Sequence, residues 1–190
     1  MRHMIIIVLV LVMSGCSTEL YKNTGDGKFS GALDVRWVNN DYFLFLPNKD
    51  NPFTFTRPNG QSIRPGKMYT DGGSIPRFFW GVKGFSPWGY APAYIVHDWM
   101  FEAQHCGYVP DNKYKFKDSV DVMAESLKAV MEQDTKVRDY FVFDSVVTAI
   151  NSPIANRLWD KGSCKVPPVG MESLIEGAEP GELLMTIKFE

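Results

Sequence analysis

Residues 92–107, PAYIVHDWMFEAQHCG, form the stretch that decides the fold, because both of its ends carry helix-boundary signals. Pro92 suits the first position of a helix, and Gly107 suits the position just past the last one. The stretch therefore predicts a helix over residues 93–106. His97 and Asp98 are neighbours within it, among apolar residues. The same helix thus supplies core positions and the first candidates for chemistry.

Further helices are expected on the C-terminal side of this stretch. Asp118 is a good N-cap for a second helix. Residues 137–151 are strongly apolar and predict a third, after which Ser152 and Pro153 restart a short helix to about Trp159. Apolar residues recur at helical spacing in the second helix at Val120, Ala124, Leu127 and Met131.

Short apolar segments on the N-terminal side alternate like strands. They cover residues 33–38, 42–46 and 53–56, and the turn residues between them are typical of antiparallel hairpins. Residues 65–92 are rich in glycine, proline and aromatic residues and predict a long structured loop. Residues 183–189 alternate like one last strand. The sequence therefore predicts an α+β fold, with a small N-terminal antiparallel sheet, a long Gly/Pro loop and a bundle of three or four helices.

The N-terminus, RHMIIIVLVLVMSGCS at residues 2–17, has the form of a bacterial lipoprotein signal. Its apolar run, residues 4–13, is about half as long as the ~20 residues that span a bilayer as a helix. Ser14 and Gly15 before Cys16 resemble the lipobox at which such signals are cleaved. Cys16 is then the expected lipidation site, and acyl chains would hold the domain to a membrane. An ordinary secretory signal and a buried apolar N-terminus are the alternatives.

The cysteines and the charge extend this interpretation. In an oxidising compartment the remaining pair, Cys106 and Cys164, is expected to form a disulfide, with two buried free thiols as the alternative. Ser17 in place of Asp after the lipidated residue is typical of lipoproteins sorted to the outer membrane, here facing the periplasm. A net charge of −2, with 20 basic and 22 acidic residues, shows no basic stripe for nucleic acid.

The expected organisation is a single domain between processed or peripheral ends. Residues 1–15 form the signal peptide that is removed, and residues 16–30 form a lipidated polar tether. Residues 31–163 form one globular domain, a suitable length for one core. Residues 164–190 form a tail packed on that domain.

Three motifs occur in order along the chain: TDGGSIPR at residues 70–77, VHDWMF at 96–101 and VDVMAESL at 120–127. Together they resemble the pattern of DUF1353, an uncharacterised family found mostly in phages and prophages. The resemblance covers roughly residues 38–149. It implies a prophage-type protein and does not imply an activity.

The His97 and Asp98 pair also resembles, locally, the helix of phospholipase A2 enzymes. That resemblance implies that His97 is the base, that Asp98 is a calcium ligand, and that Asp121 on a neighbouring helix orients His97. Oxygen ligands would come from the loop near Asp71, so calcium is the implied cofactor. Other metal chemistries lack a second histidine at a suitable spacing.

A structural interpretation of the same residues needs no catalysis. In this interpretation a buried polar network connects the loop to the helix. Its members are Ser74, Arg77, His97 and Asp98. In either case five polar residues are expected to converge, because buried polar groups need partners. They are Asp71, Arg77, His97, Asp98 and Asp121.

Two functions follow from these alternatives. One is a non-enzymatic envelope lipoprotein that contacts another surface protein and alters the envelope or excludes superinfecting phage. The other is a lipid-anchored hydrolase that acts on phospholipid or on cell-wall ester and amide bonds.

Overall fold

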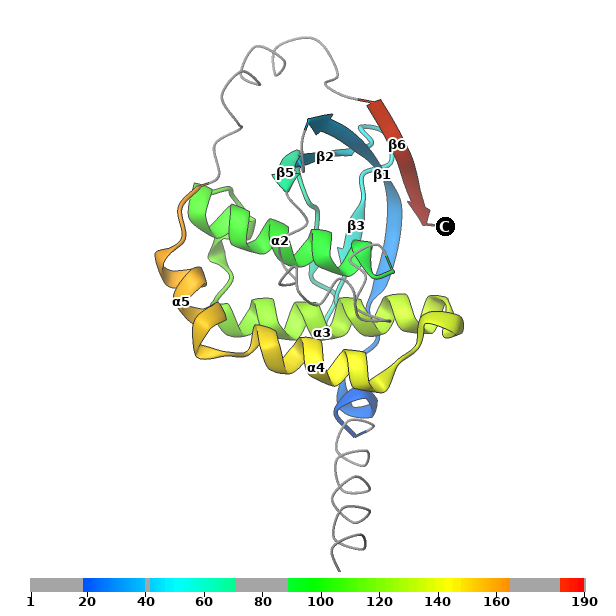
Figure 1. Ribbon diagram of the computed structural model, residues 1–190, viewed down its shortest axis with the longest axis vertical. Coiled ribbons are helices and arrows are strands. Elements are labelled where there is room, and N and C mark those ends of the chain that lie inside the picture. Colours follow the sequence, from blue (N-terminus) through cyan, green and yellow to red (C-terminus); the bar gives the residue numbers. More distant parts are fainter. Residues whose placement is uncertain (1–18, 40–41, 71–88, 165–181, 190) are drawn as a thin grey trace, which may run out of the picture.

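The computed structural model describes residues 19–39, 42–70, 89–164 and 182–189. It has the predicted α+β class, with an antiparallel sheet that curves into a half-barrel, followed by helices (Figure 1). The strands are β1 (Lys28–Asn39), β2 (Tyr42–Pro47), β3 (Thr54–Thr56), β4 (Ser62–Ile63), β5 (Met68–Thr70) and β6 (Glu182–Phe189). The α-helices are α2 (Ala91–Cys106), α3 (Phe116–Gln133), α4 (Tyr140–Ile150) and α5 (Pro153–Lys161), and two short 3-10 turns cover Asp111–Lys113 and Thr135–Val137.

The long strand β1 organises the sheet. The strand order is β4-β3-β1-β2-β5, and β6 also pairs with β1. The start of β1, from Lys28 to Ser30, pairs with β3, and the remainder pairs with β2 and β6. The hairpin expected between residues 42–46 and 53–56 is therefore wrong, because β3 lies beside β1 and β2 lies between β1 and β5.

Gly31 lies where β1 changes partners. Its φ angle is 85°, in the left-handed region that glycine adopts without strain. A Cβ atom at this position would lie 2.2 Å from the carbonyl oxygen of Pro52. Glycine thus lets the connection between β2 and β3 cross close to β1.

The helices lie on one side of the sheet. Figure 1 shows α2, α3 and α4 stacked below it with successive helices running in opposite directions, and α5 closing one end. One continuous buried core contains Leu33 and Val35 of β1, Phe53 just before β3, and Met100 and Leu127 of the helices.

The helix boundaries follow local chemistry, with two differences from expectation. Helix α2 ends at Cys106, and Gly107 follows with a φ of 70°, as predicted. Helix α3 begins at Phe116, so Asp118 is inside its first turn, where its carboxylate accepts the Lys115 backbone N–H at 2.8 Å. The third predicted helix starts later, at Tyr140, because Asp139 caps it through the N–H groups of its first turn.

Residues 19–30 of the expected tether lie in the described structure, and their first part packs on the domain. Residues 19–23 are helical, and the side chain of Tyr21 is 4% exposed. The expected last strand is β6, which is antiparallel to β1. Among the described residues, no helix combines the length and the apolar character needed to cross a membrane.

Candidate functional site

Helix α2 is the central element of the candidate site. Almost every residue of its first half is buried in the core shared with the sheet, and α2 packs on α3. His97 lies in the middle of this buried half and is 5% exposed. A helix enclosed in this way holds any polar side chain it carries away from bulk water.

The imidazole of His97 is buried beside an aromatic ring. Its ring centroid lies 5.1 Å from that of Phe101, one turn further along α2. Neither Nδ1 nor Nε2 has a hydrogen-bond partner within the described structure. Burial lowers the pKa of His97 to about 4. The ring is therefore neutral at physiological pH.

Tyr94, one turn earlier on α2, likewise carries a buried polar group. Its hydroxyl is buried and has no hydrogen-bond partner within the described ranges. Burial raises the pKa of Tyr94, and the nearby Tyr90 and Asp98 raise it further. Residues three apart share a helix face, so Tyr94 and His97 place two unsatisfied polar groups on one side of α2. The sequence gives no signal of such a role for Tyr94, because an aromatic residue in an apolar helix is ordinarily a core residue.

Asp98 is half-buried beside this pair. Its negative charge is one cause of the raised pKa of Tyr94, so the two side chains lie near each other. Its expected role as a calcium ligand stays a prediction. Asp71, Ser74 and Arg77 lie outside the described residues.

Asp121 does not form the predicted hydrogen bond with His97. Its carboxylate binds the Lys117 amine at 2.7 Å, one turn earlier on the solvent side of α3. Both ring nitrogens of His97 remain without a partner in the described part of the chain. Asp121 therefore does not orient His97 through a hydrogen bond, since its side chain is 40% exposed and both ring nitrogens of His97 are buried.

A different charged group is buried nearby, and sequence reasoning missed it. Arg57, just after β3, is 7% exposed. Its Nε and one terminal nitrogen donate to the two carboxylate oxygens of Glu125 on α3, at 2.8 and 3.0 Å. The other terminal nitrogen donates to Gln61 at 3.2 Å and lies 3.9 Å from Asp118. The hydrogen bond to Glu125 raises the pKa of Arg57 above its usual value.

This arginine cluster is structural in character. The planar fork of Arg57 matches both oxygens of one carboxylate, and the pair joins the β3–β4 turn to α3. An arginine before the turn at Pro58 has the sequence signature of an exposed residue. No local pattern marks it as buried.

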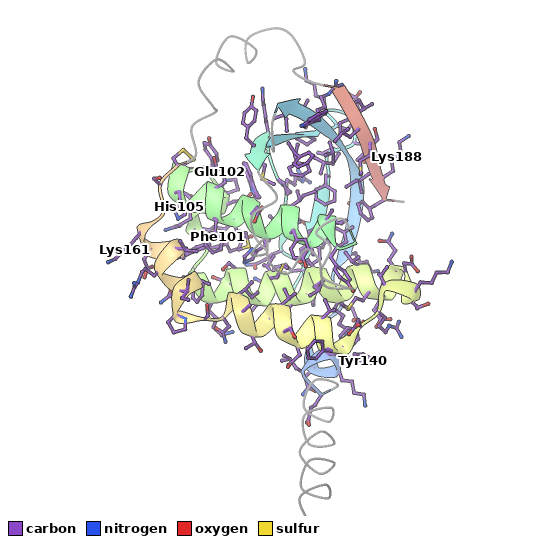
Figure 2. The ribbon with its side chains drawn as sticks, in the orientation of Figure 1. Phe101, Glu102, His105, Tyr140, Lys161 and Lys188 are labelled. Carbon is purple, nitrogen blue, oxygen red and sulfur yellow. A yellow bond between two sulfur atoms is a disulfide. The ribbon has the colours of Figure 1, made fainter. Side chains whose placement is uncertain are left out.

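The end of α2 carries the predicted disulfide. Cys106 and Cys164 are bonded, with their Cα atoms 4.6 Å apart, so this prediction is confirmed. Figure 2 shows the disulfide beside Glu102 and His105 at the end of the helix stack. The Glu102 carboxylate and the two sulfurs lie within 4.8 Å of one another. Sulfurs joined in a disulfide are not thiolates, so this group cannot bind a metal in the oxidised protein.

Comparison with known proteins gives one match. A family model described as "Protein of unknown function (DUF1353)" matches residues 50–145, half of the chain. The matched segment begins before β3 and ends within α4, so it contains Arg57, His97 and Asp121. The curated proteins contain no match. The solved structures contain none either.

Proposed function

Because this chain belongs to the DUF1353 family, whose description assigns no activity, we propose a function from the chain's own residues. It is a lipid-anchored lipoprotein of the bacterial envelope, and it acts by binding another envelope protein, without catalysis. The observation that carries the proposal is the signal at residues 2–17, which ends in Ser-Gly-Cys.

The Cys106–Cys164 disulfide supports export independently of that signal. Disulfides persist in exported proteins and are rare in the reducing cytosol. The bond lies far along the chain from the signal and depends on different residues. The proposal of export is therefore supported by the disulfide as well as by the signal, whereas lipidation at Cys16 is supported by the signal alone. Ser17 favours sorting to the outer membrane.

The environment of His97 supports a role without catalysis. A general base works best with a pKa near the working pH. Burial lowers the pKa of His97 to about 4, which makes the ring a weak base at neutral pH. The carboxylate expected to orient it, that of Asp121, is bound to Lys117. A binding function in the envelope, such as superinfection exclusion by a prophage-type protein, needs no such base.

The test is the location and acylation of a Cys16→Ala variant. The wild-type protein should incorporate labelled palmitate and separate with the outer membrane. Cys16→Ala should incorporate none, keep the mass of the precursor and no longer separate with the outer membrane. Ser17→Ala is the matched control, because it changes the adjacent residue and keeps the sulfur. Recovery of Cys16→Ala in the outer membrane at the wild-type level, or its incorporation of palmitate, would refute the proposal.

A hydrolase is the second candidate function, and one observation favours it. Tyr94 and His97 have buried polar atoms without partners in the described structure. Leaving such a group unsatisfied costs about 1–3 kcal/mol, so its presence calls for an explanation such as a bound ligand. The discriminating measurement is calcium-dependent release of fatty acid from phospholipid vesicles. Activity in the wild type that is lost in His97→Asn would establish this candidate, and its absence in the wild type would exclude this phospholipase activity.

A further inference from the structure

Residues 19–23 fix the start of the described chain to the helix stack. The Tyr21 ring makes edge contacts with Tyr140 and Phe143 of α4, each with centroids 4.9 Å apart. Its hydroxyl donates to Glu132 of α3 at 2.7 Å. Tyr21 is therefore locked between two helices.

Lys128 of α3 binds the same N-terminal segment. Its amine donates to the carbonyl oxygen of Thr24 at 2.6 Å and pairs with Asp26 at 2.9 Å. The same amine lies 5.3 Å from the centre of the Tyr21 ring. Residues 21–26 are thus held as part of the domain.

This attachment limits how far the domain can stand from a lipid on Cys16. Cys16 and Tyr21 are five positions apart in the sequence. A fully extended chain covers at most about 3.6 Å per residue, so the separation is at most about 18 Å. The N-terminal end of α4, which packs on Tyr21, must then lie close to the membrane surface.

The side chains at this end suit a lipid interface. Leu20 is 38% exposed, Tyr140 39% and Phe141 69%. Figure 2 shows Tyr140 at the lower end of the described part of the molecule, beside the helical residues 19–23. Aromatic residues are enriched at the level of the lipid headgroups.

The charges around these side chains are mixed. Basic and acidic residues are present there in equal number, so the end has no single-sign field to attract anionic lipid. Apolar contact is then the interaction that remains for a bilayer. The charged residues are Glu19, Lys22, Asp134, Lys136, Arg138 and Asp139.

We propose that the N-terminal end of α4 docks on the bilayer that holds the Cys16 lipid, with Leu20, Tyr140 and Phe141 in the interface. This inference rests on the proposed lipid anchor and adds an orientation to it. The helix stack is held at the membrane by the start of α4, and the opposite end of α4 points away from this contact.

The experiment uses the lipidated protein reconstituted in vesicles of phosphatidylethanolamine and phosphatidylglycerol. Phe141→Cys and, separately, Ile154→Cys are labelled without reductant with an environment-sensitive fluorophore. Ile154 on α5 is the matched control, because it is also apolar and is 74% exposed. The label at position 141 should shift its emission to the blue and be quenched by lipids with a quencher near the headgroup. The label at position 154 should do neither, and about 0.5 M salt should leave both results unchanged.

Flotation of the vesicles separates the two proposals. If the protein floats and the label at position 141 is not quenched, docking is wrong and the lipid anchor stands. Equal quenching at positions 141 and 154 would also overturn this orientation. A label at 141 that is shielded in cells but not quenched by lipid would assign this face to a protein partner. If the protein lacks lipid and does not float, the anchor fails and docking fails with it.

Discussion

His97 is neutral in the folded protein at physiological pH because burial removes its ring from water and lowers its pKa. Its pKa is about 4 in the native state, against an ordinary value of about 6.5 in an unfolded chain. Between these values the unfolded state binds a proton that the native state does not. The free energy of unfolding therefore falls as the pH drops through this window.

We expect this group to cost the wild type about 2–3 kcal/mol of stability between about pH 7.5 and about pH 4.5. Urea unfolding at several pH values measures it, and His97→Gln should remove this part of the pH dependence. Phe101→Leu is the control, because it disturbs the neighbouring ring and keeps the imidazole. It should lower stability at every pH and leave the slope unchanged. Equal slopes for wild type and His97→Gln would contradict the assignment.

At the scale of elements, the ion pair of Arg57 and Glu125 joins the β3–β4 turn to α3. The Arg57 side chain is 6% exposed and that of Glu125 is 15% exposed. Removing one member of such a pair leaves the other charge buried, which costs more than the pair itself contributes.

Arg57→Met should lower the free energy of unfolding by about 3–5 kcal/mol, as measured by urea unfolding. Adding Glu125→Leu should restore much of this loss, because neither position of the former ion pair then holds a buried charge. Lys117→Met is the control, since the Lys117 side chain is 82% exposed where it pairs with Asp121. Its loss should cost about 0.5 kcal/mol or less. A similar small effect for Arg57→Met would show that water reaches the Arg57 cluster.

At the scale of the whole molecule, the disulfide closes a loop that contains α3, α4 and α5. The two cysteines are 58 residues apart in the sequence. Cross-linking a loop of this length lowers the entropy of the unfolded chain. The disulfide thus holds the end of α2 to the chain that follows α5.

Replacing both Cys106 and Cys164 by Ala should lower the free energy of unfolding by about 4 kcal/mol. Urea unfolding of the variant, and of the wild type with and without reductant, checks this value. Reductant should destabilise the wild type and leave the variant unchanged. Alkylation of both cysteines in native protein without reductant would show that the bond is absent and contradict the prediction.

The sequence alone predicted the features that depend on neighbouring residues. Pro92 and Gly107 marked the ends of α2, and the alternating segments predicted β1 and β2, because caps and periodicity act within a few residues. The pairing of Cys106 with Cys164 followed from their number and from the expected compartment. The three motifs were enough to identify the family.

Tertiary structure decided the features that depend on residues far apart. Which strands pair with β1, and the burial of Arg57 against Glu125, depend on contacts across the sheet and helices that no local pattern records. The absence of a His97–Asp121 hydrogen bond has the same origin. Residue types predicted that the two side chains meet, but helix packing buries the His97 ring and leaves the Asp121 side chain 40% exposed. Local signals determine elements because their energies are local, and a site forms only where the packed elements bring its atoms together.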